Sequence, residues 1–417
     1  MSSFLLKNAR ISDVNSSWHG KSADILITDG LIANIQEGII DNQSEIIELN
    51  GAFLSPSWLD AFATVPDPGA NWKQSISSLK ANAREGGFGE VVCLCGEDPL
   101  PQKPAMISSL LKSNQQGSTK ILPLALASED KLGKEMTEVY ELKNAGAIAI
   151  TDGIVNSLRI GLKTKLLEYC ASLEIPLLLH PYAQNIVKGG QMHEGNVSVN
   201  LGLKGIPYAA ETTKLMEDLE LAKWVDTPII VLGLSSEAGV EIVRKAKADG
   251  VKVKALVPIL NLLFSDENLE GFDESFKVLP PLRKESDRTA LIKGIMDGTI
   301  DGICSNHNPQ DVESKKREFP YSDFGAAVIS EFPKFIASLI LNDKIDSDII
   351  LSKLYNGNRN VFNLSPTKIE IGDRANITVF SLSDSPELKS KKPFNLISLD
   401  SNNAGIVFQY SGEGSIN

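Results

Sequence analysis

Three polar side chains that follow short apolar runs are the strongest candidates for chemistry in this sequence. His180 follows the apolar run of PLLLHPY, Asp152 follows that of AIAITDG, and His307 lies in DGICSNHN. Two imidazoles and a carboxylate are ligand types of a Zn²⁺ hydrolase, which needs about three protein ligands and an open position for water. No HxH or HExxH pair places two such ligands side by side. The pattern alone therefore argues against an intact metal site.

Four further residues have side chains that could take part in catalysis or metal binding, but their sequence context does not favour such a role. His19 lies in a β-rich N-terminal stretch and His193 in the loop GGQMHEGN, so we expect both at the surface. Ser235 and Ser236 carry hydroxyl groups, but no GxSxG elbow or paired base surrounds them.

The candidate residues are expected at one end of a barrel. Apolar runs alternate with amphipathic helical stretches, and this alternation predicts parallel strands that are buried on both faces. Eight such units predict a closed (β/α)8 barrel, a TIM barrel, in which catalytic groups lie at the C-terminal ends of the strands. A doubly wound open sheet is the alternative, and no GxGxxG turn favours it. The predicted strands lie within 53–65, 90–96, 120–127, 147–153, 176–182, 228–236, 252–260 and 301–308.

The two ends of the chain have a different hydropathy pattern from the middle. Residues 4–55 contain short alternating strands separated by Gly and Asp, and TKIEIGDRANITVF (367–380) has the same pattern. We therefore expect residues 1–55 and 365–417 to form one discontinuous β-sandwich domain beside a barrel domain of residues 56–364.

Composition limits the class of protein. The 417 residues carry a net charge of −12, which argues against nucleic acid and anionic membrane surfaces as partners. No apolar run is long enough to span a bilayer, and the first twenty residues contain no signal-peptide core. The four cysteines are scattered through apolar stretches, as expected for reduced core thiols. We therefore expect a cytoplasmic protein.

Several longer phrases resemble dihydroorotases of the amidohydrolase superfamily, from the branch that is related to hydantoinases and dihydropyrimidinases. The resemblance spans nearly the whole chain and implies the same barrel, with zinc at its mouth. The phrases, which follow the order of the family, are GGFGEVVCL (86–94), GAIAITDG (146–153), LGLKGIPYAAETT (201–213), GFDESFKVLPPLRKESDRTALIKGIMDGTIDGI (271–303) and FGAAVISE (324–331).

The first metal-binding motif of that family is altered here. Dihydroorotases carry Asp-x-His-x-His-x-Arg and then Pro-Gly after the first strand, whereas this chain has LDAFATVPDPG (59–69). Asp60 and the Pro-Gly pair match, but the two histidine positions hold Phe62 and Thr64, and the arginine position holds Pro66. Because phenylalanine has no lone pair to donate, the resemblance implies that this half of the site is lost.

The other metal positions differ as well. His180 matches the strand-five ligand, and Asp152 falls near the strand-four aspartate. The strand-six histidine position holds Gly233. The strand-eight aspartate, the general base of the family, falls on Asn306, whose amide cannot accept a proton from water.

The substrate-binding positions are only partly kept. His307 and Gly325 match the family, but two asparagine positions hold Gly96 and Leu279. Arg283, which follows Leu279-Pro-Pro-Leu, is expected to form a structural ion pair.

The resemblance and its departures lead to two functional hypotheses. The first is a catalytically inactive protein that binds no zinc or other cofactor and acts as a non-catalytic partner in pyrimidine biosynthesis. The resemblance suggests aspartate transcarbamoylase as the partner, and a homodimer as the assembly. The alternative is an active cyclic amidohydrolase with an altered or mononuclear metal site at His180, Asp152 and His307. A third possibility, a small-molecule sensor, has no direct support in the sequence.

Overall fold

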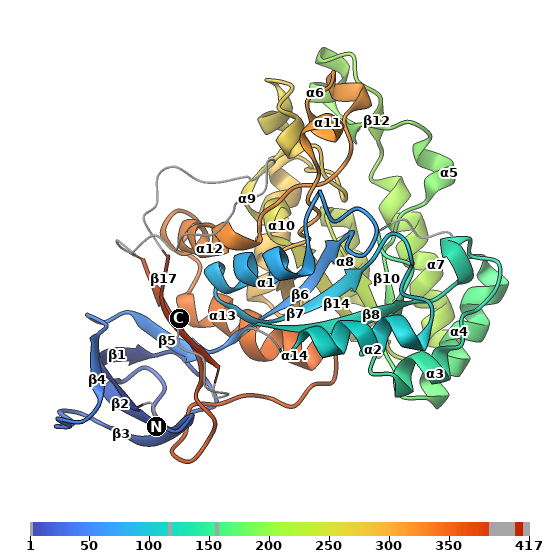
Figure 1. Cartoon of the computed structure of the whole chain (residues 1–417). Helices are drawn as coiled ribbons and strands as arrows, with labels where there is room; N and C mark the ends of the chain where they lie inside the picture. Colours follow the sequence, from blue (N-terminus) through green and yellow to red (C-terminus); the bar gives the residue numbers. More distant parts are fainter. Residues whose placement is uncertain (1–2, 116–118, 155–157, 383–404, 412–417) are drawn as a thin grey trace.

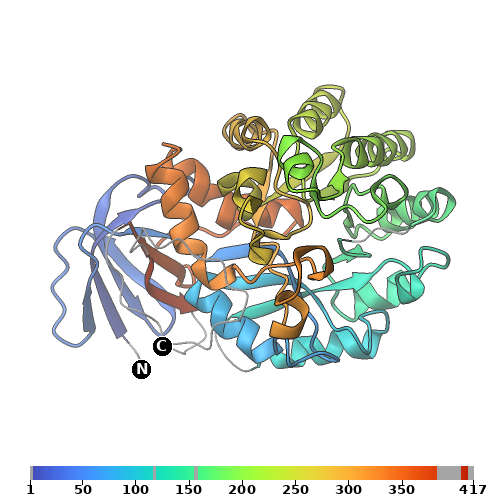
Figure 2. The ribbon, with the colours of Figure 1, turned by 90° about the horizontal axis from the view of Figure 1, so that it is seen from above.

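A closed barrel of eight parallel strands forms the centre of the molecule, as the sequence predicts (Figures 1 and 2). The computed structural model describes residues 3–115, 119–154, 158–382 and 405–411. The barrel strands are β6 (Trp58–Val65), β7 (Phe88–Cys95), β8 (Lys120–Leu126), β9 (Ala149–Thr151), β10 (Leu177–Leu179), β13 (Ile229–Leu232), β14 (Val253–Pro258) and β15 (Gly302–Cys304). Each lies within one of the eight predicted runs or overlaps it.

The barrel closes between β6 and the residues that directly follow β15. The backbone N–H of Thr64 donates to the carbonyl oxygen of His307 at 2.8 Å, and that of Asn306 donates to the carbonyl of Phe62 at 3.0 Å. The sheet order is otherwise β6-β7-β8-β9-β10-β13-β14-β15. The predicted TIM barrel is therefore confirmed, and the open-sheet alternative is not.

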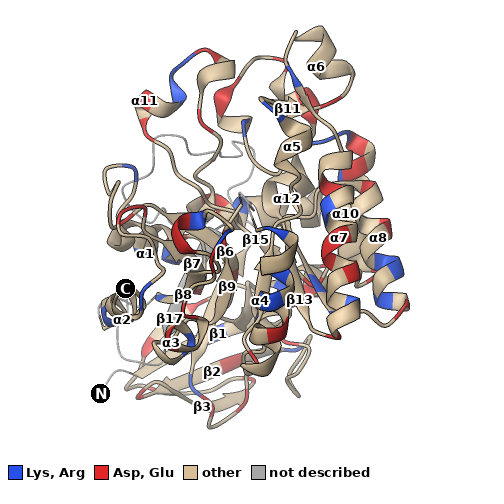
Figure 3. Ribbon diagram, turned by 90° about the vertical axis from the view of Figure 1, so that its right-hand side faces the viewer, with Lys and Arg blue, Asp and Glu red and all other residues tan. Residues whose placement is uncertain are grey.

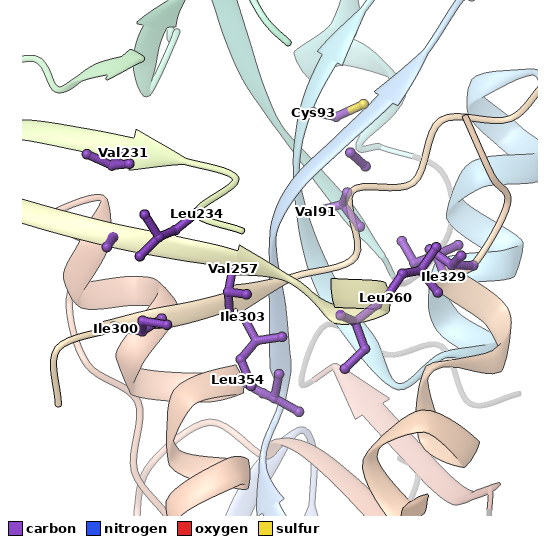
Figure 4. Close-up of a cluster of buried hydrophobic side chains, with 14 of the residues drawn as sticks. Val91, Cys93, Val231, Leu234, Val257, Leu260, Ile300, Ile303, Ile329 and Leu354 are labelled. Atoms are coloured by element: carbon purple, nitrogen blue, oxygen red, sulfur yellow. The ribbon is translucent and has the colours of Figure 1, made fainter. Parts of the chain in front are cut away.

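Apolar side chains fill both faces of the barrel wall, which is why its strands are continuously hydrophobic. The inner cluster includes Phe62, Leu94, Leu178 and Leu256, and Phe362 also belongs to it. The alternate strand residues pack outward against the helices. Figure 4 shows part of this outer layer, with Val91, Cys93, Val231, Val257 and Ile303 among its labelled members.

Helices surround the wall and connect its strands. The longer ones are α1 (Ile76–Glu85), α2 (Pro104–Ser113), α4 (Ile160–Ser172), α7 (Ala209–Val225), α8 (Glu237–Ala248), α10 (Glu285–Met296) and α12 (Phe332–Leu341). The shorter ones are α3 (Val139–Asn144), α5 (Gln184–Val187), α6 (Asn196–Asn200), α9 (Ile259–Leu263), α11 (Val312–Lys315), α13 (Ser347–Ser352) and α14 (Asn358–Val361). Acidic and basic residues are interspersed along α7, α8 and α10 (Figure 3). Within the described residues, no helix is long and apolar enough to cross a bilayer.

A separate sheet of seven strands brings the two ends of the chain together. Its order is β17-β16-β5-β1-β2-β3, with β4 paired to β1, and β16 runs antiparallel to β5. The strands are β1 (Ser3–Ile11), β2 (Ser22–Thr28), β3 (Leu31–Gln36), β4 (Glu45–Glu48), β5 (Phe53–Pro56), β16 (Asn376–Ser381) and β17 (Gly405–Ser411). The strand-rich ends therefore share one sheet, as their common pattern of short alternating strands predicts.

Candidate functional site

The mouth of the barrel lies at the C-terminal ends of its strands and has two halves, each with its own polar residues. In the half formed by β10, β13 and β14, the segment 279–283 crosses the opening. The side-chain amide of Asn261 donates to the carbonyl of Pro281 at 3.0 Å, and that of Asn306 donates to the carbonyl of Leu279 at 2.8 Å. A Cβ atom added to Gly233 would lie 3.0 Å from Nδ1 of His180 and 3.2 Å from Cδ of Pro280. The protein's own chain therefore occupies this half.

His180 is the buried imidazole beneath this segment. Its Nδ1 lies 2.8 Å from the carbonyl oxygen of Leu232, so Nδ1 carries the proton and donates it. Burial lowers the pKa of His180, while the hydrogen bond to Leu232 opposes that shift. Its Nε2 is buried and has no hydrogen-bond partner among the residues that the structure describes. His180 is thus a neutral imidazole whose Nε2 keeps a lone pair, which is the form that binds metals.

A buried polar network lies next to His180 and ties α7 to the mouth. Glu211 accepts hydrogen bonds from the backbone N–H and the hydroxyl group of both Ser235 and Ser236. Arg283 donates from Nε to the Ser235 hydroxyl at 2.8 Å, and its NH2 group lies 3.4 Å from Glu211. Both members of this ion pair have side chains that are only 3% exposed. The expected structural role of Arg283 is confirmed.

His193 also belongs to this network, and its predicted surface position is wrong. Its ring is buried, and Nδ1 lies 3.3 Å from NH1 of Arg283. Burial and the charges of Arg283 and Lys284 lower the pKa of His193 to about 4. The polar loop around it looks solvated in the sequence, but it folds back over Arg283, which comes 90 residues later.

The residues at the two histidine positions of β6 have structural contacts. Phe62 is fully buried in the inner apolar cluster of the barrel. The Thr64 hydroxyl lies 3.2 Å from the carbonyl of His307 and 3.1 Å from Oδ1 of Asn308. Asp60 accepts hydrogen bonds from the backbone and the hydroxyl of Ser305. Burial raises the pKa of Asp60 to about 7, although these hydrogen bonds oppose the shift.

Asp152 holds the loop that follows β8. Its Oδ1 accepts from the backbone N–H groups of Ala127 and Ser128 at 3.1 and 2.9 Å, and its Oδ2 accepts from the Ser128 hydroxyl at 2.6 Å. Burial raises the pKa of Asp152, whereas these hydrogen bonds lower it. The carboxylate is therefore largely committed to this loop.

His307 uses both ring nitrogens within the fold. Nδ1 accepts from the backbone N–H of Val328 at 3.0 Å, so Nε2 carries the proton and donates to Oε1 of Gln74 at 2.7 Å. Burial lowers its pKa to about 3. Gly325 has a φ of 135°, and a Cβ there would lie 2.4 Å from the Asn308 carbonyl oxygen, so only glycine fits.

Zinc, which the resemblance implies, has few donors at this mouth. Within the described ranges, no group of three or more His, Cys, Asp or Glu side chains is placed to hold a metal ion. His180 offers one nitrogen, while the donor atoms of Asp152 and His307 already serve hydrogen bonds. These residues do not fit a zinc ion held by three protein ligands.

The other half of the mouth contains an open cavity of about 360 Å³. It is lined by Thr64, Val65, Pro66, Lys73, Leu94, Gly96, Glu97, Lys131, Asp152, Gly153, Ile154, Asn308, Pro309 and Gln310. The structure therefore brings Thr64 and Asp152 to one cavity and leaves His180 in the other half. Sequence reasoning missed Lys73, Lys131 and Glu211, because nothing in their local sequence distinguishes them from solvated helix and loop residues.

The fold defines a TIM-barrel protein with a separate strand-rich sheet and a polar mouth at the C-terminal ends of its strands. L-Hydantoinase from Arthrobacter aurescens superposes with a TM-score of 0.84 over 99% of this chain and 96% of its own, at 18% identity. Dihydropyrimidinase from Brevibacillus agri gives a TM-score of 0.73 over 91% and 86%, at 16% identity. At such identities the likeness shows the fold alone.

Sequence comparison narrows the class to one family. The model of the family described as dihydro-orotase-like matches residues 51–236. The dihydroorotase of Ruminiclostridium cellulolyticum is 32% identical over 404 residues, which cover 94% of each chain. That of Carboxydothermus hydrogenoformans is 35% identical over 378 residues, 90% of this chain and 87% of its own. The chain belongs to the dihydroorotase family.

Proposed function

We propose that this chain is a non-catalytic member of the dihydroorotase family that acts as a protein partner in cytoplasmic pyrimidine biosynthesis. Aspartate transcarbamoylase is the partner that we expect, and a homodimer is the expected state of the chain itself. Relatives named dihydroorotase support the place in metabolism. These relatives do not support the proposed loss of activity, which we infer from the residues at the barrel mouth.

Asn306 is the observation that carries this proposal. It stands where the family has its general base, and its amide N–H donates to the carbonyl of Leu279. A carboxylate at this place would put two acceptors face to face, so the surroundings are built for an amide. Phe62 supports the same conclusion, because its ring fills the apolar interior at a metal-ligand position.

Metal content and turnover, measured on the same sample, test the loss of activity. We expect well under one zinc per purified chain and no ring opening of dihydroorotate or ring closure of carbamoyl aspartate above background. One tightly held zinc per chain together with turnover would contradict the proposal.

The partner is tested separately by co-expression with aspartate transcarbamoylase from the same organism. Size-exclusion chromatography with light scattering should show a complex of defined mass, and the chain alone should run as a dimer. If the two proteins elute apart at micromolar concentrations, aspartate transcarbamoylase is not the partner.

The alternative function is an active cyclic amidohydrolase with a single metal, and His180 is the observation that favours it. Its buried Nε2 has no partner in the described part of the chain and has the protonation state of a ligand. Under this alternative, His180→Gln abolishes turnover and metal uptake, whereas His19→Gln changes neither. Equal behaviour of the two variants would exclude His180 as a ligand.

A further inference from the structure

A second cavity lies at the opposite end of the barrel from the mouth. Its volume is about 880 Å³, within the range of cavities that hold small organic ligands. It opens between the N-terminal ends of β10, β13 and β14, beside the last turn of α4 and the end of α14. None of its lining residues stands at a position that the family resemblance assigns to metal or substrate.

Buried aliphatic side chains make up much of the lining of this cavity. Ile229, Ile230 and Val253, from the first residues of β13 and β14, are buried, and so are Ile175 and Val361. Because removal of apolar surface from water is favourable, a lining of branched aliphatic side chains favours a ligand with an apolar body.

The charged residues of the lining neutralise one another. Two lysines, Lys252 and Lys254, and two acids, Glu174 and Asp226, line the cavity. Nζ of Lys252 lies 2.9 Å from the carboxylate of Asp226 and 3.2 Å from its carbonyl oxygen. Lys254 lies 3.9 Å from the carboxylate of Asp301. An ion that enters the cavity would lose hydration without gaining a free counter-charge, so a neutral ligand is favoured.

Two uncharged polar side chains lie in the buried part of the lining. Thr227 is 2% exposed, and its hydroxyl has no hydrogen-bond partner among the residues that the structure describes. Since a buried hydroxyl without a partner is costly, a ligand group that bonds to it is favoured. Burial raises the pKa of Cys170 to about 12, so its thiol is uncharged near neutral pH. The buried lining thus contains a hydroxyl and a thiol but no charge.

We propose that this cavity binds a small neutral molecule with an apolar body and one hydrogen-bonding group, which bonds to the Thr227 hydroxyl. Catalytic groups of TIM barrels lie at the other end, so a ligand here binds away from the mouth. The proposal is independent of whether the chain catalyses a reaction or binds aspartate transcarbamoylase.

Calorimetric titration of the full chain with 2-naphthol near neutral pH tests the class of ligand. We expect saturable binding, and binding that is about tenfold weaker or worse for 2-naphthoate, whose carboxylate loses hydration without a counter-charge. Thr227→Val keeps the shape of the side chain and removes the hydroxyl, so it should weaken 2-naphthol binding about fivefold. Thr227→Ser keeps the hydroxyl and should retain binding.

A variant that fills the cavity tests the location of the site. Ala171 lines the cavity from an exposed position on α4, so Ala171→Trp leaves the core intact and should weaken 2-naphthol binding about tenfold or more. Ala81→Trp, at an exposed position on α1 outside the cavity, is the matched control and should bind like the wild type.

Thermal unfolding of each variant serves as the folding control. The proposal is overturned if 2-naphthol shows no saturable binding, or if 2-naphthoate binds as well as 2-naphthol. It is equally overturned if folded Ala171→Trp or folded Thr227→Val binds 2-naphthol like the wild type.

Discussion

Asn306 illustrates how single residues at this mouth have structural partners where the family resemblance places catalytic groups. Its side chain donates to a backbone carbonyl in the segment that crosses the barrel. His307, one residue later, donates to Gln74 and accepts from the backbone of Val328. Phe62 packs among the inner apolar side chains. Such roles make single-residue restoration of a catalytic group costly.

The variant Asn306→Asp should therefore lose stability rather than gain activity. The carboxylate removes the N–H donor and faces the Leu279 carbonyl at a partly buried position, which costs about 1 kcal/mol, the lower end of the range for an unsatisfied group. Urea unfolding measures the loss, and the dihydroorotate assay should stay at background. Asn200→Asp adds the same charge at an exposed position and is the matched control. If Asn306→Asp is as stable as this control, the hydrogen bond to Leu279 contributes nothing measurable.

His307 should make stability depend on pH. Burial lowers its pKa to about 3, below the ordinary value of 6.5, so the unfolded state takes up the proton first as the pH falls. The stability that neutral His307 contributes is complete above pH 6.5 and is lost between pH 6.5 and about 3, by about 1.4 kcal/mol per pH unit.

Comparison of variants isolates this contribution from that of the buried acids. Between pH 6.5 and 5.5, wild type should lose about 1 kcal/mol more than His307→Gln in urea unfolding. Parallel pH profiles for wild type and His307→Gln would contradict the buried neutral state of His307.

At the scale of elements, the sequence predicts the wall of the barrel far better than its mouth. Eight apolar runs specify eight strands because each strand is buried on both faces, and this signal is local. The course of segment 279–283 is set by Asn261, Asn306 and Gly233, which are distant in the chain, so no local pattern reveals it. For the same reason His193 looks exposed in the sequence, although its ring is buried in contact with Arg283.

The predicted roles of the mouth residues show the same difference between local sequence signals and contacts between distant segments. Residue types show that Phe62 cannot donate a lone pair, and that inference needs no coordinates. That Asp152 holds the loop of Ser128, and that this loop brings Lys131 to a cavity, depends on contacts made only in the folded barrel. Residue type at a single position can thus be interpreted from sequence alone, whereas contacts between distant segments cannot.

The ion pair between α7 and the mouth segment is testable at this scale. Arg283→Met leaves Glu211 buried without its cationic partner, and we expect a loss of about 3–5 kcal/mol in the free energy of unfolding. Arg244→Met, which removes partly exposed ion pairs to Glu241 and Asp297, should cost less than about 1 kcal/mol. Urea unfolding compares the two. Similar losses would mean that burial does not set the strength of the Arg283 pair.

At the scale of the whole molecule, an aromatic cluster joins the strand-rich sheet to the barrel. Phe380 of β16 lies 6.3 Å from Phe53 of β5 and 5.6 Å from Trp58 of β6, measured between ring centroids. Trp58 in turn contacts Phe88 of β7 at 6.1 Å. The Thr378 hydroxyl donates across the same junction to the carbonyl of Gly87 at 2.8 Å. Because the two sheets share buried side chains, we expect them to unfold together.

The variant Phe380→Ala tests this coupling. Removal of a fully buried ring should cost about 3–5 kcal/mol, and the unfolding transition should stay single, because the barrel loses its contact with the sheet in the same step. Calorimetry and far-ultraviolet circular dichroism, recorded on the same sample, should give coincident midpoints. Ile371→Ala, at a side chain that is 55% exposed, is the control and should shift the midpoint little. Two separated transitions in Phe380→Ala, with the barrel transition unshifted, would show that the strand-rich sheet is a stability unit of its own and that the barrel does not depend on it.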